Sequence, residues 1–163
     1  MDLIEIQQPR PYDLVDDEIQ VAGQAAAFEA TIHYRLTDGH DELTGFFTAG
    51  GAVAVRQFQT TISGIEATAM KQPLMFLSLF ELSPRDGSEQ KTVTVPVIYG
   101  TFLLGSYAGW QPYTVQSDDT LSGIAASVYG DSGKWRLIHV ANQHVVPNPD
   151  LIFPGQELRI PRS

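Results

Sequence analysis

The sequence contains no cysteine, few basic residues and no long hydrophobic run. Without cysteine the chain can form no disulfide, no thiolate zinc site and no cysteine nucleophile. Its 10 lysines and arginines stand against 19 aspartates and glutamates, which gives a net charge of −9. Nucleic-acid binding needs a basic surface, so we expect no nucleic-acid partner. No apolar run approaches the roughly 20 residues of a membrane-spanning helix, so we expect no membrane span.

Motifs that would indicate an enzyme are also missing. The sequence has no His-Glu-x-x-His zinc motif, no Gly-x-Ser-x-Gly nucleophile elbow and no phosphate-binding loop. The four histidines lack the spacing of metal ligands, and Asp16-Asp17-Glu18 lacks the spacing of a calcium loop. We therefore expect a protein that is not an enzyme and that carries no metal and no cofactor.

Residues 1–98 have the pattern of an all-β domain. Phe58, Thr60 and Ile62 alternate with polar neighbours, as in a strand with one buried face. Turn signals such as Asp38-Gly39 and Asp86-Gly87 separate the apolar runs. This spacing predicts an antiparallel sandwich of about 100 residues with seven strands. The predicted strands are Leu3–Ile6, Ile19–Ala27, Ala30–Leu36, Leu43–Thr48, Arg56–Ile62, Leu74–Leu82 and Lys91–Ile98.

Pro96 interrupts the last of these strands. Proline has no backbone donor, so it is found at sheet edges or in bulges. The last strand is therefore predicted to be an edge strand or to be bulged at Pro96.

Residues 99–112 join this half to the rest of the chain. The join contains three glycines but also five large apolar side chains, namely Phe102, Leu103, Leu104, Tyr107 and Trp110. A solvated tether would not expose that much apolar surface. We expect the join to pack between two domains or to dock on a partner.

Residues 113–163 change to a helical period. A short strand at Tyr113–Val115 is followed by capping residues and by Leu121, Ile124, Ala125 and Val128 at helical spacing. Trp135, Ile138 and Ala141 predict a second helix, and Leu158–Ile160 predicts a closing strand. The expected order is strand, helix, helix, strand, a small α+β domain.

Residues 113–161 resemble a LysM domain. The pattern appears as Tyr113-x-Val115, Asp119-Thr120-Leu121, Tyr129-Gly130, Ala141-Asn142 and Ile152-x-Pro154-Gly155-Gln156-x-Leu158-x-Ile160-Pro161. One position departs from it, because the usual Gly-Asp-Thr begins here with Asp118. If the loop needs a positive φ at that position, aspartate is tolerated there with strain.

Residues 3–98 resemble the immunoglobulin-like domain of bacterial spore germination proteins. The resemblance is carried by Val21-x-Gly23, Phe28-Glu29-Ala30, Tyr34-Arg35, Leu79-Phe80-Glu81, Asp86-Gly87 and Val95-Pro96-Val97. It implies a bacterial origin and an accessory domain without catalytic activity.

The LysM resemblance implies a non-catalytic binder of N-acetylglucosamine polymers, chiefly peptidoglycan and chitin. Its site would be a shallow groove between two loops. One loop would contribute Asp119, Thr120, Leu121 and Ser122, and the other Leu151, Ile152, Phe153, Pro154 and Gly155. Thr120 would also cap a helix and Ile152 would also belong to the core. Trp135 and Tyr129 fit the helical apolar pattern, so we assign them to the core rather than to sugar stacking.

Two functions stay open. The first is attachment to peptidoglycan, at the cell envelope or outside the cell if a leader has been removed. The second is a structural component of a phage-tail-like or contractile injection particle in the cytoplasm, in which the LysM domain docks on protein partners. The first residues lack the basic segment and apolar stretch of a signal peptide, which favours the second function. The best-known ligand of the resembled family favours the first.

Overall fold

A computed structural model of the chain describes residues 3–49, 51 and 54–163. The chain divides after Tyr99 into two compact units. We call residues up to Tyr99 the sandwich unit and residues 100–163 the small unit. None of the helices in the described part of the chain has the length and apolar character needed to cross a membrane.

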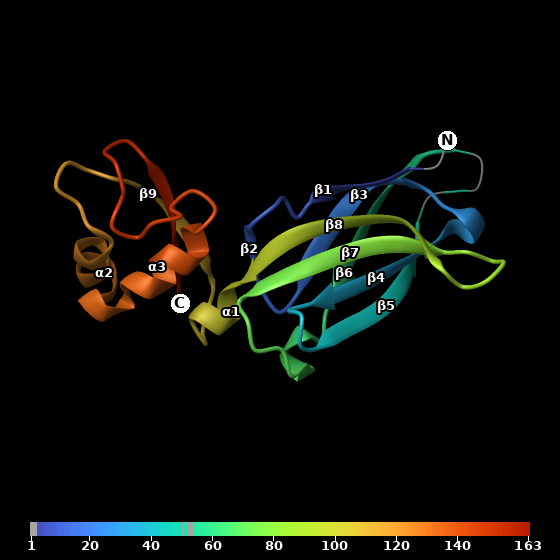
Figure 1. Ribbon diagram of the computed structural model, residues 1–163, viewed down its shortest axis with the longest axis horizontal. Coiled ribbons are helices and arrows are strands. Elements are labelled where there is room, and N and C mark those ends of the chain that lie inside the picture. Colours follow the sequence, from blue (N-terminus) through green and yellow to red (C-terminus); the bar gives the residue numbers. More distant parts are fainter. Residues whose placement is uncertain (1–2, 50, 52–53) are drawn as a thin grey trace. The chain divides into compact units, whose positions relative to one another are not determined.

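The sandwich unit consists of two sheets (Figure 1). The three-stranded sheet has the order β1-β3-β6, with β1 (Leu3–Gln8), β3 (Ile19–Ala26) and β6 (Arg56–Ile62). The five-stranded sheet has the order β2-β8-β7-β4-β5. Its strands are β2 (Asp13–Val15), β4 (Thr31–Thr37), β5 (Glu42–Thr48), β7 (Leu74–Leu82) and β8 (Glu89–Tyr99). Short 3-10 turns follow β3 at Phe28–Ala30 and β6 at Ile65–Ala67.

Alternating residues on the inner faces of the two sheets form the core of this unit. Val21, Ile32, Leu36 and Leu77 are fully buried in it. All seven predicted strands are present, with ends that shift by at most two residues. The sequence prediction missed β2, since three residues are too short to show a period.

Pro96 lies where β8 gains its second neighbour. β2 pairs with β8 in parallel only from Val97 to Tyr99, and the carbonyl of Pro96 accepts a bond from the Tyr12 amide. From Pro96 back to its start, β8 is paired on one side only, by β7. The missing donor of Pro96 therefore falls just outside the ladder with β2. The bulge in β8 lies elsewhere, opposite the step from Leu79 to Glu81.

A buried carboxylate fixes the turn after β4. Asp38 accepts hydrogen bonds from the backbone amides of His40 at 2.8 Å, Asp41 at 3.0 Å and Gln72 at 2.9 Å, and also from the Lys71 amide. Burial alone raises the pKa of Asp38, but these backbone donors favour the carboxylate and together hold its pKa well below the ordinary value. Asp38 thus ties the β4–β5 turn to the segment before β7.

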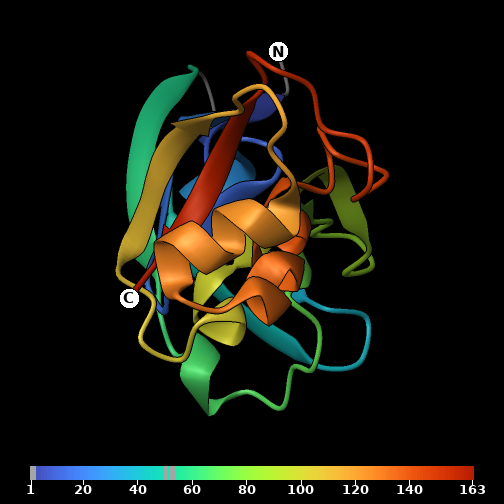
Figure 2. The ribbon, with the colours of Figure 1, turned by 90° about the vertical axis from the view of Figure 1, so that its left-hand side faces the viewer.

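The small unit has the predicted order of strand, helix, helix and strand. Its elements are α1 (Gly100–Leu103), β9 (Gly109–Thr114), α2 (Leu121–Tyr129), a 3-10 turn at Ser132–Lys134, α3 (Trp135–Asn142) and β10 (Glu157–Arg162). β9 and β10 pair antiparallel, and α2 and α3 lie side by side in Figure 2. Ile124, Ile138, Leu158 and Ile160 form the centre of the core.

The predicted join, residues 99–112, contributes structure to the small unit. Gly100 begins α1, and the ring of Tyr107 lies so close to it that a Cβ there would come within 2.6 Å. Four of the six paired residues of β9, Gly109 to Pro112, also come from the join. Phe102 and Trp110 remain roughly half exposed.

Candidate functional site

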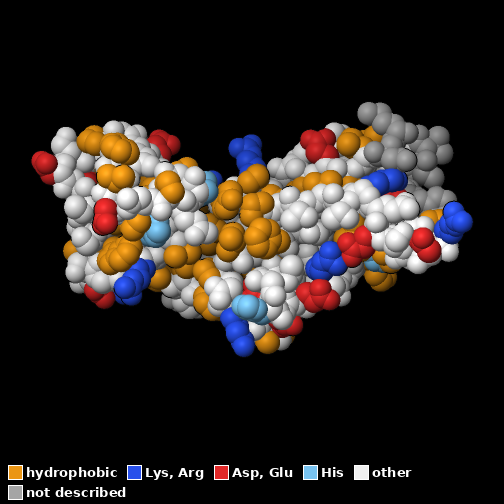
Figure 3. All heavy atoms as spheres, viewed as in Figure 1, with side chains coloured by type: hydrophobic (Ala, Val, Ile, Leu, Met, Phe, Trp, Pro, Cys, Tyr) orange, Lys and Arg blue, Asp and Glu red, His pale blue; other side chains and the backbone are white. Residues whose placement is uncertain are grey.

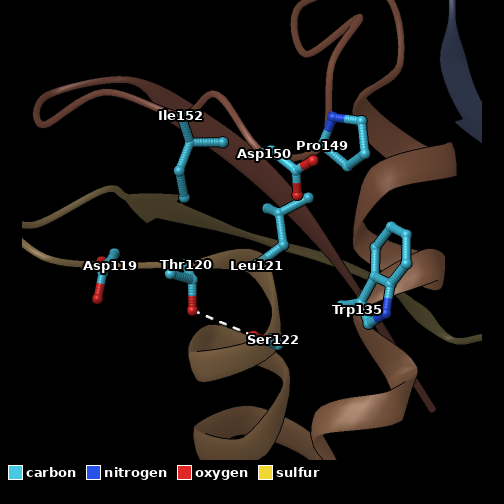
Figure 4. Close-up of a pocket in the computed structure, with 8 residues that line it drawn as sticks. All are labelled: Asp119, Thr120, Leu121, Ser122, Trp135, Pro149, Asp150 and Ile152. Carbon is cyan, nitrogen blue, oxygen red and sulfur yellow. Dashed lines mark hydrogen bonds between the residues drawn. The ribbon is translucent and has the colours of Figure 1, made fainter.

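A groove of about 370 Å³ opens between the two loops of the small unit. Its lining residues come from the start of α2, from the start of α3 and from the loop before β10. They are Asp119, Thr120, Leu121, Ser122, Trp135, Pro149, Asp150 and Ile152. We call this hollow the loop groove. In Figure 4, Ile152 and Asp150 lie across from Thr120 and Leu121, and Trp135 lies below Pro149.

The first loop is a tight turn held by Asp119. The Asp119 amide bonds to the carbonyl of Gln116 at 3.3 Å, and Asp118 between them has a φ of 67°. This is the third position of a four-residue turn, where a positive φ normally selects glycine. The left-handed conformation anticipated at the departure from the LysM pattern is therefore present. The carboxylate of Asp119 accepts bonds from the Gln116 amide at 2.7 Å and from the Tyr113 hydroxyl at 2.8 Å.

Thr120 connects this turn to α2. It is the N-cap of the helix, and its hydroxyl accepts a bond from the Gly123 amide at 3.1 Å. Leu121 then points into the core and is 3% exposed, whereas Ser122 is exposed at the groove. One short segment thus supplies both a cap that stabilises α2 and one wall of the groove.

The second loop ends in a four-residue turn from Phe153 to Gln156. The Gln156 amide bonds to the Phe153 carbonyl at 3.0 Å, with Pro154 second and Gly155 third, and Gly155 has a φ of 85°. Proline and glycine at these positions are typical of a type II turn. Bonds from Gly155 to Val115 at 2.8 Å and from Val115 to Gln156 at 2.9 Å attach this turn to the end of β9. Backbone bonds therefore fix this loop to the end of β9, to which the Tyr113–Asp119 bond fixes the first loop.

The groove combines apolar walls with uncharged and acidic polar groups. Ile152 and Trp135 supply the half-buried apolar surface, and both also pack against the core of the unit. Hydroxyls come from Thr120 and Ser122, and carboxylates from Asp119 and Asp150, while none of the described lining residues is basic. Such a site suits a neutral ligand with an apolar face and amide or hydroxyl groups, and disfavours an anion.

Five of the nine residues predicted for the site line the loop groove: Asp119, Thr120, Leu121, Ser122 and Ile152. The other four, Leu151, Phe153, Pro154 and Gly155, lie on the same loop but outside the lining, and all four are exposed. Three lining residues were not predicted: Trp135, Pro149 and Asp150. Pro149 and Asp150 directly precede the predicted stretch of residues 151–155, so a predicted range that began two residues earlier would have included them.

The two aromatic residues assigned to the core from the sequence have different surroundings. Tyr129 packs against the core, and its hydroxyl donates to the Pro161 carbonyl at 2.8 Å. Burial raises the pKa of Tyr129 to about 12. Trp135 packs against the core with one part of its ring and lines the groove with another. Helical periodicity cannot reveal this double position, since Trp135 is the first residue of α3.

Two protein families match the chain. Residues 3–88 match the immunoglobulin-like domain of bacterial spore germination, Gmad2, and residues 113–161 match the LysM domain. Both resemblances identified in the sequence are thereby confirmed. Immunoglobulin-like and LysM domains are binding modules without catalytic activity of their own.

Curated relatives match a limited part of the chain. The chain is 51% identical over 53 residues to potassium binding protein Kbp of Escherichia coli, covering 32% of this chain and 36% of that protein. It is 51% identical over 49 residues to an uncharacterized protein of Deinococcus radiodurans (30% and 19%), and 41% identical over 59 residues to YqbP of Bacillus subtilis (31% and 27%). The aligned parts thus span at most 36% of these relatives. No solved structure gives a significant match.

Proposed function

The chain belongs to the family of the immunoglobulin-like domain of bacterial spore germination and carries a LysM domain, and we propose on this premise that it binds peptidoglycan without catalysis. The ligand is an N-acetylglucosamine-containing glycan strand, held in the loop groove at the cell envelope or outside the cell. The observation that carries the proposal is the groove itself, which opens between the two loops that the LysM resemblance designates.

The chemistry of the groove supports this ligand. An N-acetylglucosamine unit offers an amide, hydroxyls, a methyl group and an apolar ring face, and it carries no charge. The apolar surfaces of Ile152 and Trp135 can receive the methyl group and the ring face, while the loop backbones and Ser122 can bond the polar groups. Because the Tyr113–Asp119 bond fixes the first loop to β9 and backbone bonds fix the second loop to its end, little conformational entropy is lost on binding.

One groove of this size should bind weakly. Attachment to a polymer becomes tight only when several binding sites act together, because the second contact is then intramolecular. The acidic charge of the chain lies mainly outside the small unit. Residues 1–98 hold 6 basic and 14 acidic residues, and residues 99–163 hold 4 and 5. The small unit is therefore nearly neutral, which suits a binding surface for a neutral sugar.

Co-sedimentation with purified peptidoglycan tests the proposal. Ile152→Asp places a charge on the apolar wall of the groove and should weaken binding at least tenfold. Ser122→Arg, which changes an exposed lining residue, should also weaken binding and provides a second probe if Ile152→Asp perturbs folding. Circular dichroism should show unchanged helical content in each variant used.

Two matched controls accompany these variants. Leu82→Asp makes the same kind of change on an exposed apolar residue of the sandwich unit, and Ser127→Arg makes it on an exposed face of α2 outside the groove. Both should bind as well as the unchanged chain. Folded Ile152→Asp and Ser122→Arg proteins that sediment with peptidoglycan as the controls do would refute the proposed groove.

A further inference from the structure

A second hollow, of about 290 Å³, lies where the paired strands β9 and β10 meet the end of α3. It shares no residue with the loop groove. The strands supply Trp110, Pro112, Glu157, Leu158 and Arg159, and the segment at the end of α3 supplies Asn142, His144 and Val145. We call it the strand-pair hollow. Figure 3 shows one face of the small unit, where hydrophobic side chains reach the surface in separate groups with charged ones between them.

Trp110 is an open aromatic surface in this hollow. Its side chain is 45% exposed, and the Arg159 guanidinium lies 5.4 Å from the centre of its ring. Arg159 covers one face of the indole and holds its orientation, so the exposure belongs to the rest of the ring. Val145, also 45% exposed, and Pro112 extend the apolar surface around it. A single exposed apolar residue is ordinary, whereas three at one concave place offer a ligand an apolar surface to pack against.

The floor of the hollow is rigid. The side-chain amide of Asn142 donates to the carbonyls of Ile138 and Arg159, both at 2.7 Å, and its oxygen accepts from the Arg159 amide at 2.7 Å. Asn142 thereby fixes the end of α3 to β10. The Val145 carbonyl accepts a bond from the Gln156 side chain at 3.0 Å, which fixes the remaining wall. The hollow is therefore formed before any ligand arrives.

The charges around the hollow select a neutral ligand. Glu157 and Arg159 carry opposite charges, which cancel, and His144 adds a polar ring. Planar polar groups at the rim of an exposed indole can bond hydroxyls while the ring stacks on an apolar face. A volume of about 290 Å³ lies at the lower end of the range for small-molecule sites, which fits one sugar ring rather than an extended oligomer.

We infer that the strand-pair hollow is a second saccharide site, in which one neutral pyranose ring stacks on the open face of Trp110. The choice of N-acetylglucosamine as the sugar rests on the proposed function of the loop groove. The two hollows make the small unit bivalent toward a glycan, which strengthens attachment to a polymer without any further contact in either site.

The two tryptophans of the chain allow each hollow to be observed separately, because Trp110 lines the strand-pair hollow and Trp135 lines the loop groove. In the full chain carrying Trp135→Phe, Trp110 is the only source of tryptophan emission. Titration of this variant with triacetylchitotriose, a soluble N-acetylglucosamine trimer, should change the Trp110 emission in a saturable manner. The change should persist when Ile152→Asp disables the loop groove.

Val145→Arg fills the strand-pair hollow and should raise the trimer concentration at half-saturation at least tenfold, whereas the control Ser127→Arg should not. Trp110 emission that stays constant, or that responds only while the loop groove is intact, would overturn the second site. The proposed function is measured independently by the emission of Trp135 in the Trp110→Phe chain and by co-sedimentation. A response of Trp135 without one of Trp110 would therefore reject the second site and leave the loop groove in place.

Discussion

The hydroxyl of Tyr113 donates a 2.8 Å hydrogen bond to the carboxylate of Asp119, and this bond fixes the first wall of the loop groove to β9. The bond and the burial of the phenol both raise the pKa of Tyr113. The bonded form of the loop thus needs a protonated phenol beside an ionised carboxylate. The loop is held by the strand rather than by the ligand.

Tyr113→Phe should therefore affect both stability and binding. Removal of the hydroxyl should cost about 1 kcal/mol of unfolding free energy, and more if the Asp119 carboxylate is left poorly bonded. The loosened loop should also weaken peptidoglycan binding. Tyr129→Phe is the matched control, because it removes the 2.8 Å bond to Pro161 without touching a lining residue. It should lose comparable stability and no binding, as measured by chemical denaturation and co-sedimentation.

Asp118 should respond to substitution according to its φ of 67°. Glycine adopts this conformation without steric cost, so Asp118→Gly should leave stability unchanged or raise it by up to about 1 kcal/mol. Asp118→Ala should be less stable than Asp118→Gly by about 1 kcal/mol, because alanine keeps the Cβ that is strained at this φ. Since Asp118 is exposed, burial does not complicate the comparison. An alanine variant as stable as the glycine variant would show that backbone strain does not limit the loop.

Asp38 should make the sandwich unit sensitive to acid. Its pKa is lower in the folded chain than its ordinary value of 3.8, so protons bind the unfolded chain more strongly. The stabilisation is complete above that value and is lost as the pH falls toward the folded pKa. Asp38→Asn should be less stable by about 3 kcal/mol at neutral pH, because an amide has one acceptor oxygen and two of the four backbone donors would face its NH2 group.

The difference in unfolding free energy between the unchanged chain and Asp38→Asn should narrow as the pH falls from about 4 to about 2, the range just below the ordinary pKa of aspartate. Glu66→Gln, which removes an exposed carboxylate of the same unit, is the control. Its unfolding free energy should differ from that of the unchanged chain by the same amount over this pH range. A gap between the unchanged chain and Asp38→Asn that is independent of pH would contradict the assigned role of the carboxylate.

The start of the small unit sets the length of fragment that folds alone. A fragment of residues 100–163 keeps all six pairs of the β9–β10 ladder, whereas one of residues 113–163 loses the four from Gly109 to Pro112. The longer fragment should unfold cooperatively on heating, and the shorter should melt at a lower temperature or without a clear transition. Equal melting temperatures would show that the join adds no stability to this unit.

Much of the fold could be predicted because its elements are periodic. The alternation in β6 and the helical spacing of Leu121, Ile124 and Ala125 identify buried faces directly. The strand β2 escaped prediction because Asp13–Val15 is too short for a period, and the true start of β9 was hidden in the glycine-containing join.

The site was less predictable, because loop residues have no period. The resemblance designates residues 151–155 as one block, but only Ile152 of this block points into the groove. Phe153 is 62% exposed outside the lining, on a turn whose geometry is set by Pro154 and Gly155. Trp135 was assigned to the core, although its position at the start of α3 leaves part of its ring at the groove.

The most direct test of glycan binding is amide chemical-shift mapping of the isotope-labelled chain during titration with triacetylchitotriose. We predict saturable shifts for the amides of residues 119–122, Asp150 and Ile152, which line the loop groove, and their loss in Ile152→Asp. Amides of the sandwich unit, such as that of Asp38, should not shift and serve as internal controls. A titration that leaves the amides of residues 119–122, Asp150 and Ile152 unchanged in the folded chain would contradict glycan binding in the loop groove.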